Sequence, residues 1–87
     1  MRTQLLAARA AALFASELPT GSRPSGSAID AAVAASVRGF GGTRGCVAMM
    51  ATAYGDCPET AAPRMRWALA MVAGTRHREP DRHLVAA

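Results

Sequence analysis

The chain has 87 residues, of which 51% are hydrophobic, and its formal net charge is +4. This length allows one domain with a small core, because burial alone barely stabilises chains much shorter than this. The positive charge favours anionic partners only weakly. No segment approaches the ~20 consecutive apolar residues of a membrane-spanning helix, so we expect no membrane partner.

The first expected element is a helix over residues 4–18, within an N-terminal segment of residues 1–18. Thr3 can cap it, and its apolar residues recur at helical spacing on one face: Leu6, Ala10, Leu13, Phe14 and Leu18. The segment has the apolar character of a signal peptide. However, Arg9 interrupts the apolar run and Glu17 follows it, so we expect a cytoplasmic protein.

A linker is expected over residues 19–26, which are rich in Pro, Gly and Ser. A helical domain over residues 27–74 follows it. Ser27 is expected to be the N-cap of the second helix, with Asp30 three positions later in the place of the acidic residue of a capping box. The second helix is expected over residues 28–38, with an apolar face made of Ile29, Val33 and Val37.

The glycine-rich stretch of residues 39–45 is interpreted as a connection between helices. It lacks the Gly-Lys-Ser/Thr ending of a phosphate-binding loop, and no apolar strand precedes it, so nucleotide binding is not expected. Thr43 can cap a third helix that ends at Tyr54. This helix is expected to turn four residues inward: Val47, Met50, Ala51 and Tyr54.

The fourth helix is expected to hold Pro58 in its first turn and to end at Gly74. Residues 75–87 are polar, rich in Arg and His, and interrupted by Pro80. Such a composition is typical of a flexible tail.

Catalytic and metal-binding chemistry has little support in the sequence. Cys46 and Cys57 are eleven positions apart, and with His77 and His83 they match no usual zinc pattern. No His stands beside a carboxylate on an expected helix, and neither cysteine has a placed base. We therefore expect two reduced thiols, no metal, no cofactor and no enzymatic activity.

The spacing between the third and fourth helices is typical of a helix-turn-helix. Ala51 and Gly55 lie one helical turn apart, so a second helix can cross closely at Ala51 and Gly55 can take the left-handed conformation of a tight turn. The fourth helix then has one apolar face, made of Ala61, Met65, Ala68, Leu69 and Val72. A three-residue turn would join the two helices.

Residues 50–69 resemble the helix-turn-helix of sigma-70 region 4 and of related small bacterial regulators. That family has an Ala-x-x-x-Gly turn before a Thr-apolar-x-x-Arg-apolar recognition helix, and the matching residues here are Ala51, Gly55, Thr60-Ala61 and Arg64-Met65. The resemblance implies a helix that reads bases in the DNA major groove.

The sequence thus predicts an all-α protein, a small orthogonal bundle of about four helices with its helix-turn-helix in residues 46–73. The leading functional hypothesis is a small DNA-binding transcriptional regulator or accessory factor. Its DNA contacts are expected from five side chains: Arg44, Glu59, Thr60, Arg64 and Arg66.

A second hypothesis stays open beside DNA binding. Arg64 and Arg66 are equally compatible with a solvated helix face, since residues 45–74 carry no net charge. Trp67 and Met71, one turn apart, form a second apolar stripe that either the first helix or a partner chain would cover. On this hypothesis the protein is an interaction module that docks a protein partner or forms a homodimer through Trp67 and Met71.

Overall fold

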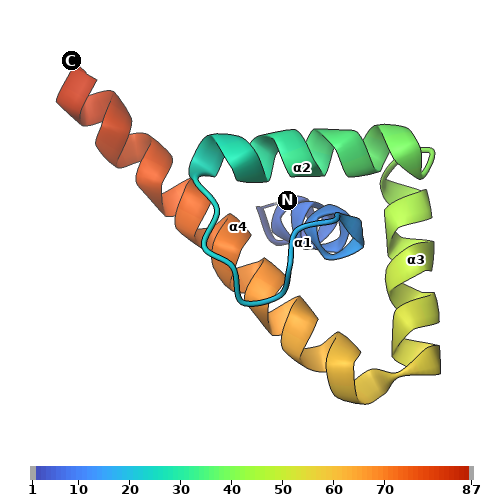
Figure 1. Cartoon of the computed structure of the whole chain (residues 1–87). Coiled ribbons are helices and arrows are strands. Elements are labelled where there is room, and N and C mark those ends of the chain that lie inside the picture. Colours follow the sequence, from blue (N-terminus) through green and yellow to red (C-terminus); the bar gives the residue numbers. More distant parts are fainter. Residues whose placement is uncertain (1, 87) are drawn as a thin grey trace.

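The computed structural model describes the backbone of residues 2–86 and the side chains of residues 5–74. Four helices make up this part of the chain, and no strand occurs in it (Figure 1). The helices are α1 (Arg2–Ala15), α2 (Gly26–Gly39), α3 (Thr43–Asp56) and α4 (Pro58–Ala86). The expected all-α fold class is confirmed.

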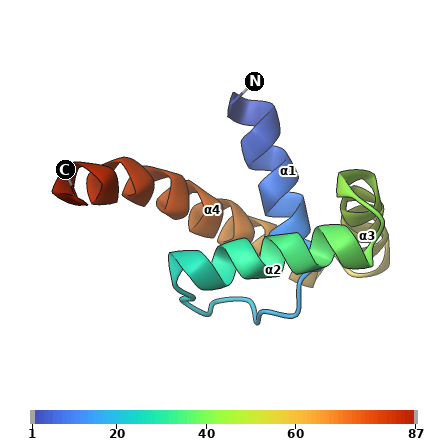
Figure 2. The same cartoon turned by 90° about the horizontal axis from the view of Figure 1, so that it is seen from above.

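The helices α2, α3 and α4 surround α1 on three sides (Figure 1). Seen from above, α1 stands up from the layer that the other three helices form, and its N-terminal half projects beyond that layer (Figure 2). The helix α1 contacts all three of the others. It is therefore the central element of the bundle.

The core is built around the C-terminal half of α1, where five consecutive residues are buried: Ala10, Ala11, Ala12, Leu13 and Phe14. Alanine side chains end at Cβ and let the surrounding helices approach α1 on several sides. Leu13 and Phe14 are the large buried side chains of α1, and the other helices add four more: Ile29, Cys46, Trp67 and Val72. Burial of these apolar side chains, at roughly 1.5–3 kcal/mol for each large one, is the main stabilising contribution.

The helix α1 ends at Ala15, three residues before the expected end. Ser16 closes the last turn, because its backbone N–H and its hydroxyl both donate to the Leu13 carbonyl oxygen, at 3.1 and 2.6 Å. The Ser16 hydroxyl oxygen also accepts from the backbone N–H of Leu18 at 3.3 Å. These local bonds compete with the helical ones and end the helix before Pro19.

The expected cap of α2 is shifted by two residues. Ser25, not Ser27, is the N-cap, and its hydroxyl oxygen accepts from the backbone N–H of Ala28 at 3.2 Å. Asp30 takes no part in a capping box. Its carboxylate instead accepts from Arg9 of α1 at 2.7 Å, which forms an ion pair on the protein surface.

The turn between α2 and α3 depends on glycine. Gly41 and Gly42 have φ values of 78° and 106°, in the left-handed region that favours glycine. Gly42 is the N-cap of α3 without a side-chain bond, so Thr43 is its first helical residue and not its cap. A Cβ on Gly45 would lie 1.6 Å from the carbonyl oxygen of Phe40, so this position accepts no larger residue without a shift of the turn.

The expected three-residue turn with a left-handed Gly55 is wrong. Gly55 lies inside α3, and its φ is not positive. A single residue, Cys57, separates α3 from α4, with φ −152° and ψ 78°. The physical reason is Pro58, because the ring of a proline disfavours the helical conformation for the residue before it.

The helix α4 begins at Pro58, as expected, but it continues past Gly74 to Ala86. The expected helix end at Gly74 is therefore wrong. The predicted flexible tail of residues 75–87 falls outside the described side chains and stays a prediction. In the described part of the chain, no helix combines the length and apolar character that crossing a membrane requires.

Candidate interaction surface

Arg64 of α4 holds the C-terminal end of α1. Its Nε donates to the carbonyl oxygen of Phe14 at 2.8 Å, and its Nη2 donates to that of Ser16 at 2.8 Å. Its Nη1 donates to the hydroxyl oxygen of Thr20 at 2.9 Å. The last carbonyl groups of a helix have no partner within the helix, so Arg64 supplies the donors that α1 lacks.

The guanidinium of Arg64 lies against two aromatic rings. Its central carbon is 5.6 Å from the ring centroid of Phe14 and 5.1 Å from that of Trp67. Burial lowers the pKa of Arg64, although the guanidinium stays charged at neutral pH. Three of the five N–H donors of this guanidinium are thus committed to the end of α1 and to Thr20. Arg64 therefore has a structural role that the DNA-binding hypothesis did not include.

Trp67 belongs to the core of the monomer. Its side chain is only 8% exposed, and its Nε1 donates to the carbonyl oxygen of Ser22 at 2.8 Å. The linker thus crosses over the stripe that was expected to be a docking face. Met71 is half-buried and packs against the same core. The chain itself therefore covers Trp67, which is one of the two alternatives that the sequence left open, whereas it covers Met71 only in part.

The other four expected DNA contacts are exposed. Thr60 donates its hydroxyl to the Cys57 carbonyl at 3.2 Å, and Glu59 accepts from the Cys57 thiol at 3.6 Å. Arg44 and Arg66 form no ion pair or hydrogen bond with any described residue. Arg44 lies in α3 and the other three in α4, and Glu59 adds a negative charge, so they form no uniformly basic surface.

A groove with a volume of about 630 Å³ lies between α1, α3 and α4. We call it the α1–α3–α4 groove. The helix α1 contributes Ala7, Ala8, Ala10 and Ala11, α3 contributes Thr43, Val47, Met50 and Tyr54, and α4 contributes Met65 and Leu69.

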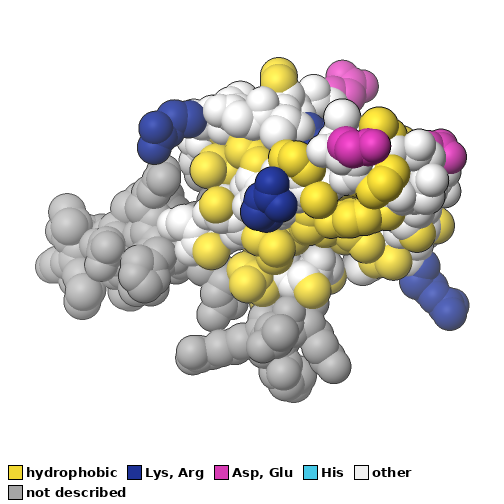
Figure 3. Space-filling view, turned by 90° about the horizontal axis from the view of Figure 1, so that it is seen from below, with side chains coloured by type: hydrophobic (Ala, Val, Ile, Leu, Met, Phe, Trp, Pro, Cys, Tyr) yellow, Lys and Arg dark blue, Asp and Glu magenta, His cyan; other side chains and the backbone are white. Residues whose placement is uncertain are grey.

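Large apolar side chains remain accessible in this groove. Val47, Tyr54 and Leu69 are 42, 37 and 38% exposed, and Met50 and Met65 are half-buried. The view from below shows apolar side chains gathered over one broad area, with a basic side chain within it and both basic and acidic side chains beside it (Figure 3). Because the four alanines of α1 end at Cβ, they leave the space between the larger side chains of α3 and α4 unfilled.

This groove was not expected from the sequence. Val47, Met50, Ala51 and Tyr54 were expected to face inward on a covered side of the third helix. The signal that could have revealed the groove is the composition of α1, whose residues 7, 8, 10 and 11 are all alanine. Such a face cannot cover the long side chains of two neighbouring helices.

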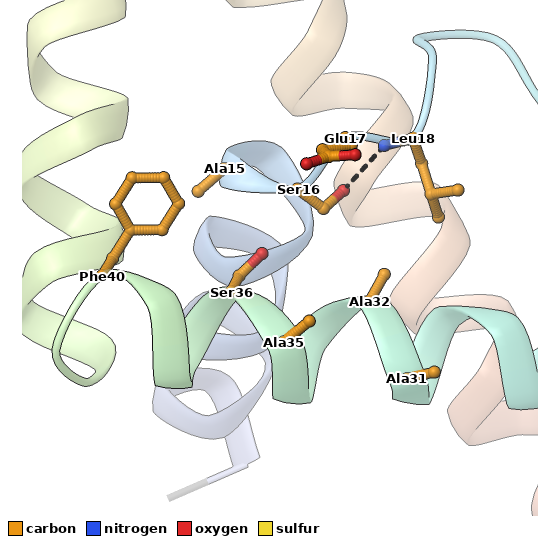
Figure 4. A pocket seen from close by; sticks show the side chains of 9 residues that line it. All are labelled: Ala15, Ser16, Glu17, Leu18, Ala31, Ala32, Ala35, Ser36 and Phe40. Carbon is orange, nitrogen blue, oxygen red and sulfur yellow. Dashed lines mark hydrogen bonds between the residues drawn. The ribbon is translucent and has the colours of Figure 1, made fainter.

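A second hollow of about 460 Å³ lies between α2 and the segment that follows α1 (Figure 4). Small residues of α2 form its floor: Ala31, Ala32, Ala35 and Ser36. Phe40 and Leu18 stand at its two ends, and Glu17 lies at its edge (Figure 4). It offers fewer large apolar side chains than the α1–α3–α4 groove, so it is the weaker candidate for a binding surface.

The two cysteines are free thiols in different surroundings. Cys46 is fully buried, and burial raises the pKa of its thiol. Cys57 is exposed at the junction of α3 and α4. Within residues 5–74, no three His, Cys, Asp or Glu side chains lie together as metal ligands would.

No family model matches the chain, and neither the curated proteins nor the solved structures include a significant match. The resemblance of residues 50–69 to sigma-70 region 4 therefore stays a prediction. What the chain can bind has to be argued from its own surface.

Proposed function

We propose that the protein is a protein-interaction module that binds an apolar partner surface in its α1–α3–α4 groove. The observation that carries the proposal is the accessibility of Val47, Tyr54 and Leu69, three large apolar side chains from two helices in one concave surface. Scattered exposed apolar residues are ordinary, but a contiguous apolar surface typically marks an interaction site. The proposal retains the interaction hypothesis from the sequence and moves it away from Trp67.

The DNA-binding hypothesis has lost two of its supports. Arg64 is engaged with α1, and Gly55 does not form the turn that the motif requires. Among the described side chains, the accessible cations beside the expected recognition helix are Arg66 and, on α3, Arg44. Sequence-specific and nonspecific DNA binders alike use many phosphate contacts, and these two arginines are a small basis for such contacts.

The test is a displayed library of amphipathic helices, each about four turns long, sorted for binding to the full chain. Helices enriched on the wild type are then measured on Val47→Asp and Leu69→Asp. A charge in the apolar groove is costly to bury, so we expect affinity to fall more than about tenfold in both variants. Met49→Asp is the matched control, because Met49 is also 42% exposed on α3 but does not line the groove.

Thermal melting followed by circular dichroism establishes that each variant folds. The proposal fails when no enriched helix distinguishes Val47→Asp and Leu69→Asp from Met49→Asp. It also fails when short DNA duplexes of random sequence bind more tightly than any selected helix, with an affinity that falls steeply as salt is added. That second result would restore the DNA hypothesis.

A further inference from the structure

We infer that the partner is an amphipathic α-helix of another protein, with acidic side chains flanking its apolar face. This inference depends on the proposed function, since it names the occupant of the same α1–α3–α4 groove. Three observations carry it: the length and floor of the groove, the position of two free arginines at its edges, and the charge of this chain's own helices.

The groove has the dimensions that a helix requires. Its α3 wall extends over twelve residues of one helix, from Thr43 to Tyr54, and the two ends are about 16 Å or three turns apart. On α1, Ala7 and Ala8 are accessible and their short side chains permit close approach of a second backbone, whereas Ala10 and Ala11 are buried. Met50 and Met65 are flexible side chains that can adapt to the apolar residues of the incoming helix.

Arg44 and Arg66 lie at the edges of the groove. Arg44 stands three residues before Val47 on α3, and Arg66 stands three residues before Leu69 on α4. Residues three apart are neighbours on a helix surface, so each arginine is adjacent to an apolar residue that lines the groove. Both arginines are exposed, and neither is paired with a described residue.

Two other arginines near the core already have partners within the chain. Arg9 is paired with Asp30, and Arg64 is bonded to the end of α1. The lining of the groove contains no charged side chain. An incoming helix would therefore meet an apolar floor with a free positive charge on the α3 side and another on the α4 side, which is complementary to carboxylates flanking an apolar face.

A second copy of this chain is a poorer occupant. By sequence, α1 and α4 are net positive, and α2 and α3 carry equal numbers of acidic and basic residues. None of the four helices is net acidic, so no helix of a second copy offers Arg44 and Arg66 a surplus of carboxylates. Like charges at the edge of an interface disfavour association.

The test uses the displayed helix library with the flanking positions randomised among Glu, Gln and Lys. Sorting on the wild-type chain is expected to enrich Glu at these positions. The double variant R44Q/R66Q is expected to lose this enrichment and to bind the selected helices more weakly, by about 1.5- to 5-fold for each arginine removed. The matched control is R23Q/R38Q, which removes the same charge from exposed positions in the linker and on α2, neither of which contributes a residue to the groove.

The outcomes separate this inference from the proposed function. Groove-dependent binding without Glu enrichment, or with an equal loss in R23Q/R38Q, overturns the inference and leaves the interaction module standing. The inference is also wrong if sedimentation shows self-association that Leu69→Asp abolishes and Met49→Asp does not, because a second copy then fills the groove. Absence of any groove-dependent binder overturns both the inference and the proposed function.

Discussion

At the scale of single residues, Arg64 decides how the candidate motif is interpreted. Its position in the sequence is suited to a phosphate or base contact, yet its three guanidinium nitrogens donate to Phe14, Ser16 and Thr20. Two of these acceptors are carbonyl groups at the end of α1. Such groups cost free energy when they are left without a donor, so the arginine contributes more to stability than an exposed one can.

Replacing Arg64 is expected to destabilise the fold. Arg64→Ala should lower the free energy of unfolding by about 2–3 kcal/mol, measured by urea denaturation, because it leaves carbonyl groups of α1 unpaired. Arg64→Lys should restore only part of this loss, since an ammonium cannot span three separate acceptors as the guanidinium does. Arg66→Ala is the control and should stay within about 0.5 kcal/mol of the wild type. Equal effects of Arg64→Ala and Arg66→Ala would show that Arg64 does not hold α1.

The two thiols should differ in reactivity at neutral pH. Cys57 is exposed and should react rapidly with a thiol reagent, whereas Cys46 is buried with a raised pKa and should react only when the chain unfolds. A colorimetric thiol titration should therefore give one fast equivalent, which Cys57→Ser removes. Two fast equivalents in the folded protein would contradict the burial of Cys46.

The raised pKa of Cys46 also has a consequence for stability. As the pH rises past the ordinary thiol value of 9.0, the unfolded chain releases the Cys46 proton more readily than the folded one. The contribution of Cys46 to the free energy of unfolding is therefore present below that pH and is lost above it.

At the scale of helices and turns, the periodic patterns of the sequence predicted the elements, and local chemistry set their ends. Ile29 and Val72 lie on expected apolar faces and are buried. The N-cap of α2 is Ser25 and not the expected Ser27, and the break between α3 and α4 lies at Cys57 and not at Gly55. A glycine accepts the helical conformation as well as the left-handed one, so Gly55 alone could not locate the turn. Pro58 was the more reliable signal, since it restricts the residue before it.

Two glycine substitutions in α3 are expected to change the free energy of unfolding in opposite directions. Gly45→Ala should lower the free energy of unfolding by about 2 kcal/mol or more, because its Cβ would meet the Phe40 carbonyl oxygen. Gly55→Ala should raise it by about 0.5–1 kcal/mol, since Gly55 is helical and its Cβ would meet nothing within 4 Å. Thermal melting of the two variants measures both effects. Destabilisation by Gly55→Ala would instead support the left-handed turn.

At the scale of the whole molecule, the arrangement of helices decides which apolar faces are covered. The sequence shows that α4 is apolar on two sides, but it cannot show which side the rest of the chain covers. The linker and α1 cover Trp67, whereas Leu69 stays accessible beside the alanine face of α1. The groove was therefore not predictable from α4 alone, because it arises from three helices that are distant in sequence.

The central claim, that the α1–α3–α4 groove is the binding surface, is tested most directly by amide chemical-shift mapping of the isotope-labelled chain. The titrant is the tightest helix obtained from the displayed library. We expect the largest shifts at the residues that line the groove on α1, α3 and α4, together with Arg44 and Arg66 at its edges. Shifts concentrated on α2 and the linker, or larger shifts along α4 when duplex DNA replaces the helix, would contradict the account.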